Sequence, residues 1–307
     1  MNPYLNINRL EFVLTDRCTG RCKHCSVGER VRHPRGTHVP QDAAVRAVRE
    51  LKDIYNVQSV MTFGGEPLLY PEVVCAIHNM AADCGIPKRQ IITNGFFSRD
   101  MAYIRDVVQS LAAAGVNDLL LSVDAFHQET IPLDLVRYFA RAVKAAGIEK
   151  ARFSPAWVVN EGFDCPENTR TREVLAALAD TGLPVHEGND IFLAGNAIMH
   201  LAHYYPPANL PVQDCCGSMP YTEPLTSQTS LSIEPDGNVT VCGFVIGNVC
   251  RENMAEIIAR YDPTADEGMR AAAEGVPGLL ALAEKRGIKV DLNRCYSVCD
   301  LCRMVNK

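Results

Sequence analysis

The chain of 307 residues is 47% hydrophobic and 21% charged, so it is long enough to bury a large core without disulfide support. Its net charge of −6 argues against nucleic acid as a partner, and no apolar run is long enough to span a membrane. The first residues lack the pattern of a signal peptide. Thirteen cysteines in such a chain indicate metal ligands in a reducing compartment, so we expect a cytoplasmic protein.

Short apolar runs alternate with longer amphipathic stretches from about residue 9 to residue 187. The apolar runs predict strands over residues 10–14, 57–63, 90–93, 118–123, 151–159 and 183–186. The amphipathic stretches predict helices over residues 41–54, 70–84, 99–114, 133–146 and 169–181. Strands that alternate with helices form parallel βαβ units, so we expect an α/β fold whose chemistry gathers at the C-terminal ends of the strands.

The first motif follows the first predicted strand directly and has the spacing Cys18-x3-Cys22-x2-Cys25. Thiolates are the ligands of iron–sulfur clusters, and three of them leave one iron open to a small chelating molecule. Structural zinc usually takes four protein ligands, and disulfides fit poorly with the composition. The motif therefore favours a cluster over zinc or a disulfide.

Polar motifs close the next three predicted strands. Gly64-Gly65-Glu66 ends the second strand, where two glycines permit close backbone approach and the carboxylate offers an acceptor. Asn94 ends the third strand, and Ser122 and Asp124 end the fourth. Each has an ordinary alternative, since Gly-Gly and Asn-Gly are turn sequences and Asp124 suits a helix N-cap.

The last part of the chain carries seven of the thirteen cysteines. A proline-rich stretch precedes them, so we expect a first domain at residues 1–203, a linker at 204–214 and a second domain at 215–307. Alternating residues around Asp236-Gly237 predict a hairpin that ends at Cys242, and a helix is expected over 253–261.

The cysteine loop and the Gly-Gly-Glu-Pro sequence, each placed after a strand, resemble those of the radical S-adenosylmethionine (radical SAM) superfamily. The resemblance implies a partial (β/α)6 TIM-like barrel in which Cys18, Cys22 and Cys25 hold a 4Fe–4S cluster. SAM would chelate the open iron, and an electron from the cluster would cleave it to a 5′-deoxyadenosyl radical. An electron donor such as flavodoxin or ferredoxin is implied as a partner.

The resemblance also implies which residues contact SAM. These are Gly64, Gly65, Glu66, Asn94, Ser122, Asp124, His24 and Arg152. His24 stands where the family usually has an aromatic side chain packed by the adenine, and Arg152 is a candidate partner of the SAM carboxylate. His127 and Glu129 follow Asp124 and are candidate acid or base groups near the substrate, with a solvated loop as the alternative.

The C-terminal cysteines resemble those of the SPASM/twitch extensions, which implies a small α+β domain with an auxiliary iron–sulfur cluster. The expected ligands are Cys216, Cys242, Cys299 and Cys302, with Cys215 and Cys295 as substitutes. A structural zinc at the same four cysteines is the alternative. The remaining cysteines are expected to be packing residues: Cys75, Cys84, Cys165 and Cys250. Residues 194–197 resemble the Gly-Arg-Ala element that often closes the barrel, with Asn196 where Arg is commoner.

The resemblance leaves two classes of substrate. The first is a ribosomally made peptide, modified by a crosslink, a thioether or epimerisation. Because the first strand begins by about residue 9, a peptide substrate is then expected to need a separate leader-binding protein or to dock directly on the barrel. The second is a small metabolite that is oxidised or rearranged. A non-catalytic iron–sulfur or zinc-binding protein is the remote alternative, for which the Gly-Gly-Glu motif is unnecessary.

Overall fold

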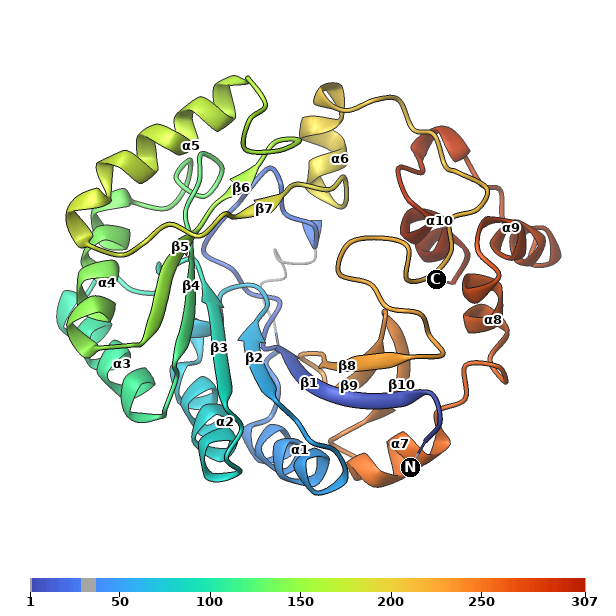
Figure 1. Ribbon diagram of the computed structural model, residues 1–307, viewed down its shortest axis with the longest axis horizontal. Coiled ribbons are helices and arrows are strands. Elements are labelled where there is room, and N and C mark those ends of the chain that lie inside the picture. Colours follow the sequence, from blue (N-terminus) through green and yellow to red (C-terminus); the bar gives the residue numbers. More distant parts are fainter. Residues whose placement is uncertain (1, 29–36, 307) are drawn as a thin grey trace.

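One curved sheet of eight strands surrounds the interior of the protein in the computed structural model, which describes residues 2–28 and 37–306 (Figure 1). Residues 1, 29–36 and 307, which belong to the two expected domains, lie outside this description. The strand order is β10-β9-β8-β1-β2-β3-β4-β5. The strands from the first half of the chain pair in parallel: β1 (Leu5–Val13), β2 (Ser59–Phe63), β3 (Lys88–Thr93), β4 (Asp118–Ser122) and β5 (Lys150–Ser154). Because β5 and β10 do not pair, the sheet is an open, partial barrel, as expected.

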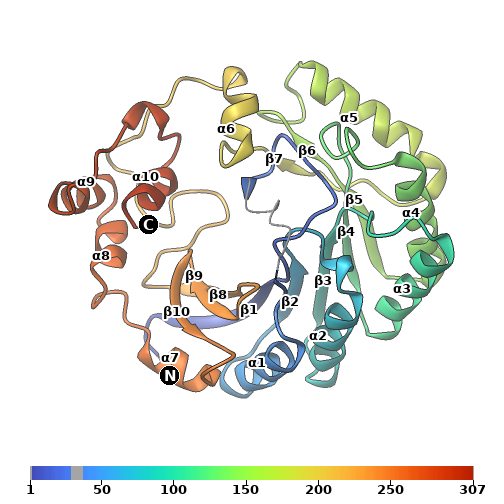
Figure 2. The ribbon, with the colours of Figure 1, turned by 180° about the vertical axis from the view of Figure 1, so that it is seen from behind.

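The helices between these strands cover the outer, convex face of the sheet (Figures 1 and 2). They are α1 (Gln41–Ile54), α2 (Pro71–Asp83), α3 (Met101–Ala113), α4 (Leu133–Ala146) and α5 (Pro166–Ala177). Alternation along β1 explains the layering, since Leu10 and Phe12 are fully buried beneath the helices. Glu11 and Val13, between and after them, line cavities on the inner side.

The predictions for the fifth and sixth strands need correction. The expected strand over 151–159 is interrupted at Pro155, which has no backbone N–H, so it becomes β5 and a short β6 (Ala156–Trp157). Strand β6 pairs with β7 (Asn189–Asp190) in a separate two-stranded sheet. The expected strand over 183–186 is reduced to a single bridge between Phe153 and Val185.

Three strands from the C-terminal part extend the same sheet on the other side of β1. Strand β8 (Gln228–Ile233) runs parallel to β1, with Leu231 opposite Leu10 and Ile233 opposite Phe12. The expected hairpin is present, because β9 (Asn238–Val241) returns antiparallel to β8, and β10 (Phe244–Asn248) completes it. Residues 206–211 of the expected linker have no regular structure, but the sheet is continuous across the linker.

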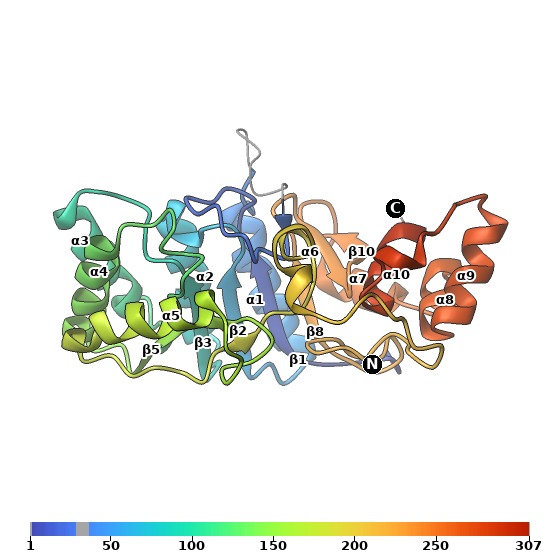
Figure 3. The same cartoon turned by 90° about the horizontal axis from the view of Figure 1, so that it is seen from above.

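Short helices complete the fold, and α8 to α10 lie at the opposite end of the molecule from α3 and α4 (Figures 1 and 3). They are α6 (Asn196–Leu201), α7 (Met254–Arg260), α8 (Glu267–Ala273), α9 (Val276–Lys285) and α10 (Val298–Val305). Single 3-10 turns are η2 (Pro67–Leu69), η3 (Ala179–Thr181), η4 (Ala202–Tyr204) and η5 (Leu292–Arg294). Within residues 2–28 and 37–306, none of the helices has the length and apolar character needed to cross a bilayer.

Candidate cofactor site

A cavity of about 400 Å³ lies at the C-terminal ends of the parallel strands. Its walls include residues from the ends of four neighbouring strands: Val13, Phe63, Ile92 and Ser122. The three cysteines of the first motif, Cys18, Cys22 and Cys25, also line it. The strand ends and the cysteine loop therefore form one site.

The cysteine loop turns tightly over Gly20. An ideal Cβ on Gly20 would lie 3.3 Å from the sulfur of Cys22 and 3.7 Å from that of Cys18, so both sulfurs flank this residue. The amide of Gly20 donates a hydrogen bond to the Cys18 sulfur at 3.3 Å, and the Cys25 amide donates to the Cys22 carbonyl at 3.2 Å. The loop thus presents its thiols from a compact backbone.

The two glycines of the second motif fit against the cysteine loop. The Gly65 amide donates to the Thr15 carbonyl at 2.7 Å, and the Glu66 amide donates to the Arg17 carbonyl at 2.7 Å. An ideal Cβ would lie 2.9 Å from the Thr15 oxygen at Gly64 and 2.0 Å from the Arg17 oxygen at Gly65. Both glycines also line the cavity. Because they have no side chain, their backbone lies close both to the cysteine loop and to the space inside the cavity.

Glu66 differs from its expected role as an open acceptor at the cavity. Its carboxylate is fully buried and accepts hydrogen bonds from the Thr93 hydroxyl at 2.7 Å, the Asn94 amide at 2.8 Å and the Leu68 amide at 2.9 Å. Burial raises the pKa of Glu66 to about 7, although these hydrogen bonds act in the opposite direction. Glu66 braces the ends of β2 and β3 and does not line the cavity.

Asn94 lies between the end of β3 and the cysteine loop. Its side-chain nitrogen is 3.6 Å from the Cys18 sulfur and 3.2 Å from the Thr19 hydroxyl oxygen, and its side-chain oxygen accepts from the Phe96 amide at 2.8 Å. Asn94 and Ser122 both line the cavity, which agrees with their expected location.

Asp124 is fully buried and holds His127 instead of facing the cavity. One carboxylate oxygen accepts from the amides of Phe126 at 3.0 Å and His127 at 2.9 Å, as a cap of the turn. The other lies 2.8 Å from His127 Nδ1 and accepts from the Ala156 amide at 3.2 Å.

Burial acts to raise the pKa of Asp124, but the nearby histidines lower it well below its ordinary value. Burial opposes protonation of His127, yet Asp124 raises its pKa well above the ordinary value.

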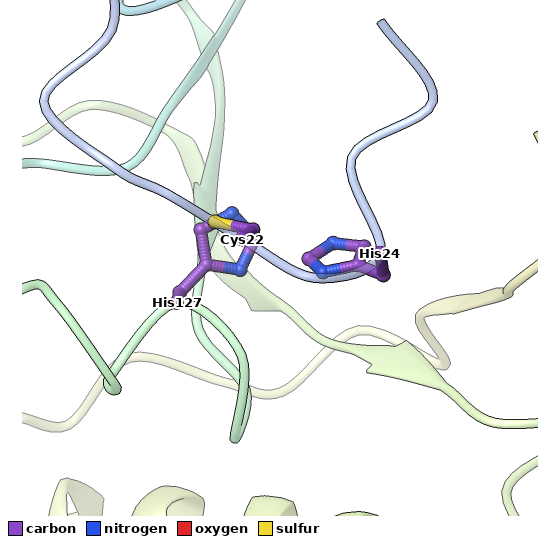
Figure 4. Close-up of side chains that lie close together, drawn as sticks. All are labelled: Cys22, His24 and His127. Carbon is purple, nitrogen blue, oxygen red and sulfur yellow. The ribbon is translucent and has the colours of Figure 1, made fainter. Parts of the chain in front are cut away.

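His127 and His24 lie beside the cysteine loop (Figure 4). The ligand atoms of Cys22, His24 and His127 all lie within 4.8 Å of one another, and His127 forms a hydrogen bond with Cys22. The His24 ring centroid is 5.0 Å from those of Phe126 and His127. Burial lowers the pKa of His24 to about 4, so it is a neutral aromatic wall of the cavity.

Two expected site residues lie elsewhere. Arg152 pairs with the buried carboxylate of Asp118 at 3.1 Å, at the start of β4, which is the end of the sheet opposite the cavity. Glu129 pairs with Lys23 at 2.8 Å in a partly exposed contact and does not line the cavity. Arg152 forms an ion pair with the buried carboxylate of Asp118, and Glu129 forms one with Lys23 of the cysteine loop, so neither occupies its expected place.

The four cysteines expected as auxiliary ligands come together in the C-terminal part. The sulfurs of Cys216 and Cys242 are 3.7 Å apart. Cys299 and Cys302 lie three residues apart on α10, and both are electrostatic neighbours of Cys242. The contact with Cys216 lowers the pKa of Cys242 to about 7, whereas burial raises that of Cys299 to about 11. These four thiols form a second candidate metal centre.

The other C-terminal cysteines are not part of this group. Cys295 is fully buried, with its sulfur 3.6 Å from the Asp291 carbonyl oxygen and 3.9 Å from the Met304 sulfur. Cys215 has no contact with the four sulfurs among those recorded for the described chain. Cys250 was expected in the core but is exposed beside the Gly237 turn, because the chain leaves β10 at the surface there.

Two further cavities adjoin the first. One of about 530 Å³ lies beside β1, β8 and β9, and Glu234 lines both it and the first cavity. Its walls are polar: Cys242, Glu11, Glu223, Thr229, Ser230 and Ser232 are among them. The other, of about 550 Å³, shares residues 189–192 with the first cavity and reaches the exposed rings of Phe192 and Tyr221.

The segment 194–197 also secures the cysteine loop. The Asn196 amide donates to the Cys25 carbonyl at 2.9 Å, and its side-chain nitrogen donates to the Cys22 carbonyl at 3.2 Å. An ideal Cβ on Gly195 would lie 2.4 Å from the Ser26 oxygen. In the sequence, only the resemblance of this segment to a barrel-closing element pointed to this role. No sequence feature predicted that residues 189–192 line the cavity.

Comparison with known proteins identifies the class. Residues 12–163 match the Radical SAM superfamily model, and the chain belongs to this superfamily of enzymes. It is 29% identical over 126 residues to a GTP 3′,8-cyclase of Desulforamulus reducens, covering 41% of this chain and 37% of that protein. It is 26% identical over 173 residues to a GTP 3′,8-cyclase of Moorella thermoacetica, covering 52% and 50%. The chain thus spans half or less of the length of these curated relatives.

The fold also resembles solved structures over nearly its whole length. Native anSMEcpe with bound AdoMet superimposes with a TM-score of 0.51 at 13% identity, covering 98% of this chain and 95% of that chain. The similarity establishes the shared open-barrel fold. The superfamily binds a 4Fe–4S cluster and SAM, which are therefore the cofactors of this enzyme, and its members need a substrate and an electron donor.

Proposed function

We propose that this enzyme cleaves SAM reductively in the cavity at the strand ends and abstracts hydrogen from a bound substrate. The observation that carries the proposal is that one cavity gathers three thiols, two glycines and two polar side chains: Cys18, Cys22, Cys25, Gly64, Gly65, Asn94 and Ser122. When bound, the cluster supplies the electron that cleaves SAM to methionine and a 5′-deoxyadenosyl radical, which takes hydrogen from the substrate.

The residues present fit a cluster with three thiolate ligands. Burial raises the pKa of Cys18 to about 12, so the metal must displace its proton, and the Gly20 amide and Asn94 side chain are in place to stabilise the thiolate. His24 supplies an aromatic wall for the adenine, and Asn94 and Ser122 supply polar groups for the ribose and methionyl carboxylate.

A second cluster is proposed at Cys216, Cys242, Cys299 and Cys302. A zinc ion about 2.3 Å from each sulfur needs sulfur–sulfur distances of about 3.8 Å. Among the residues that the structure describes, no three of these four sulfurs lie within 4.8 Å of one another. The Cys216–Cys242 distance of 3.7 Å by itself fits zinc, but the four thiols together are not gathered as closely as a zinc tetrahedron requires. A cluster is therefore proposed on this ground together with the resemblance to the SPASM/twitch extensions. Cys242 also lines the polar cavity that adjoins the first, so such a cluster can exchange electrons with a substrate there.

The proposed substrate is a ribosomally made peptide that receives a crosslink, a thioether or an epimerised residue. The support is the open cavity that shares residues 189–192 with the SAM cavity and ends at Phe192 and Tyr221, because a peptide can lie there and extend to solvent. Proposed partners are flavodoxin or ferredoxin as reductant and a separate leader-binding protein. The proposed division at residues 204–214 makes the second cluster part of a twitch-like unit.

A small polar metabolite is the second candidate, because the cavity beside Cys242 is lined by carboxylates and hydroxyls. Such side chains bind hydroxyl and amine groups through hydrogen bonds. The curated relatives named above are GTP 3′,8-cyclases, which is consistent with a small substrate but concerns proteins matched over only part of their length.

One anaerobic experiment tests the activity and separates the substrates. The reconstituted enzyme is incubated with SAM, dithionite and size-fractionated extract of the source organism grown in heavy water, and deuterium in 5′-deoxyadenosine is measured by mass spectrometry. A peptide substrate predicts transfer from a fraction that loses activity on protease treatment. A metabolite predicts transfer from the small-molecule fraction, unchanged by protease. Absence of 5′-deoxyadenosine from every fraction would contradict the proposed activity.

A further inference from the structure

We infer that Tyr205 is a positioning residue, whose hydroxyl takes the place of a backbone hydrogen bond between β6 and β7. The hydroxyl thereby fixes residues 189–192, the wall that the SAM cavity shares with the neighbouring cavity of about 550 Å³. The inference rests on the proposal that SAM binds in the cavity at the strand ends. Tyr205 itself lines neither cavity and acts through this shared wall.

The hydrogen bonds between β6 and β7 follow the regular order of a parallel pair of strands. The Asn189 amide donates to the Pro155 carbonyl at 2.9 Å, and the Ile191 amide donates to the Trp157 carbonyl at 2.8 Å. The bonds of a parallel pair are evenly spaced along both strands. The next bond in this order would therefore join the Val159 amide to the Ile191 carbonyl.

The Tyr205 hydroxyl occupies the position of this next bond. The Val159 amide donates to the hydroxyl oxygen at 3.0 Å, and the hydroxyl donates in turn to the Ile191 carbonyl. Both backbone groups are satisfied, and one hydroxyl group separates the two strands. The Tyr205 ring packs against the apolar cluster that includes Val158, Ile191 and Cys22, which holds the hydroxyl in place.

Val159 has a backbone conformation that needs this support. Its φ is 61°, and the Asn160 amide donates to the Val158 carbonyl at 2.7 Å, which closes a γ-turn with a positive φ at its centre. This form of the turn is strained, and a β-branched residue rarely adopts a positive φ. The side chain of Asn168, which is fully buried, binds the amide and carbonyl of Val158 at 2.9 and 3.1 Å and the Asn160 carbonyl at 2.9 Å. Asn168 therefore holds the two ends of the turn, and Tyr205 holds its centre, as expected where strain serves a site.

The Tyr205 hydroxyl lies where the two cavities meet. Ile191 lines both cavities, and Asn160, which follows Val159, lines the larger one. Without the hydroxyl, the Val159 amide and the Ile191 carbonyl would either bond each other, which draws the strands together, or lose their partners, which releases the strained turn. Either change moves the wall of the SAM cavity. We therefore expect Tyr205 to set the affinity for SAM without taking part in its cleavage.

Tyr204, the preceding residue, provides a matched comparison. Its ring packs against the same apolar cluster, and its hydroxyl donates to the Glu167 carboxylate at 2.8 Å. Replacement of either tyrosine by phenylalanine removes one hydrogen-bonded hydroxyl and keeps the ring. Only the Tyr205 replacement removes a group that joins β6 to β7.

The test measures SAM binding to anaerobically reconstituted wild type, Tyr205→Phe and Tyr204→Phe. Each protein is reduced with dithionite and titrated with SAM, and the change in the EPR signal of the N-terminal cluster gives the dissociation constant of SAM. For Tyr205→Phe we expect this constant to rise about tenfold, because two buried backbone groups lose their partner at the cavity wall. For Tyr204→Phe we expect less than about a twofold change. At saturating SAM, the rate of 5′-deoxyadenosine formation should agree within about twofold in all three proteins, which general misfolding would not produce.

The outcomes separate the inference from the proposed function. Equal dissociation constants in Tyr205→Phe and Tyr204→Phe, at equal iron content, would overturn the role of Tyr205, as would a slower 5′-deoxyadenosine formation at unchanged SAM affinity. If Tyr205→Phe does not retain the cluster, both replacements are made in Val159→Gly, because glycine adopts a positive φ without strain. Equal constants in that background overturn the inference. A wild type that binds iron but shows no response to SAM would instead contradict the proposed function.

Discussion

Gly65 lies so close to Arg17 that a Cβ on Gly65 would be 2.0 Å from the Arg17 carbonyl oxygen. The amides of Gly65 and Glu66 donate to the carbonyls of Thr15 and Arg17, which lead into the cysteine loop, at 2.7 Å. The end of β2 and the loop that carries the thiols are therefore joined backbone to backbone. A side chain at this position would separate them.

Replacement of Gly65 by alanine is expected to disrupt the cysteine loop. Because the clash is with backbone, which cannot move aside as a flexible side chain does, we expect a loss of about 3 kcal/mol of unfolding free energy. Gly147→Ala is the control, since Gly147 has a φ of 73° and nothing within 4 Å of its Cβ position. It should lose about 1 kcal/mol and keep its iron. Urea unfolding and iron analysis distinguish the two, and equal iron loss in both would contradict this contact's role.

Arg152→Met is expected to destabilise the protein and to leave SAM affinity unchanged. The replacement strands the buried Asp118 carboxylate, which Arg152 contacts at 3.1 Å, so we expect a loss of about 3 kcal/mol, reduced by the remaining contact of Asp118 with Lys88 at 3.3 Å. Urea unfolding and calorimetric titration with SAM measure the two effects. A tenfold loss of SAM affinity at unchanged stability would restore Arg152 as a cofactor ligand.

Glu66 predicts a pH dependence of stability in the cluster-free protein. Its pKa is raised in the folded state from 4.5 to about 7, so its stabilising contribution is present below pH 4.5 and is lost as the pH rises through 7. The loss approaches about 3 kcal/mol. Urea unfolding at pH 5 and pH 8 measures it, and Glu66→Gln should remove this part of the dependence. An equal dependence in wild type and variant would show that Glu66 does not titrate there.

Single replacements of the C-terminal cysteines test the second centre. Cys242 and Cys250 are both exposed and lie on the same hairpin, but only Cys242 contacts Cys216. We expect Cys242→Ala to lower the iron content of the reconstituted protein by up to four irons per chain, about one cube. Cys250→Ala should retain all of it. Equal iron in both variants, or zinc retained in the wild type in place of iron, would contradict the proposed cluster.

The sequence predicted correctly the elements that depend on residues close to one another in the chain. The periodicity of residues 41–54 and 133–146 gave the bounds of α1 and α4, and the spacing of Cys18, Cys22 and Cys25 predicted that their thiols share one site. The grouping of Cys216 and Cys242 with the α10 cysteines was also predicted, through the resemblance. These features depend on residues close in sequence or on a known arrangement.

The errors concern partners distant in sequence. The pairing of β8 with β1, the partner of Arg152 and the contact between His127 and Cys22 join residues that no periodicity relates. Glu66 belongs to a sequence motif typical of ligand binding, yet three donors enclose its carboxylate. They come from the end of β3, the residue after it and η2. The predicted strand at 183–186 was weakly apolar, and Val185 is 52% exposed. Tertiary contacts decide these positions.

The central claim is that two separate sets of cysteines hold two clusters, and iron analysis of the Cys18→Ala/Cys22→Ala/Cys25→Ala variant tests it most directly. The variant and the wild type are reconstituted anaerobically, and iron, sulfide and zinc are measured per chain. We predict about eight irons in the wild type and about four in the variant, with no 5′-deoxyadenosine formed by the variant. Iron near zero in the variant, with zinc or no metal at the C-terminal cysteines, would contradict the account and leave a single-cluster enzyme with a structural C-terminal part.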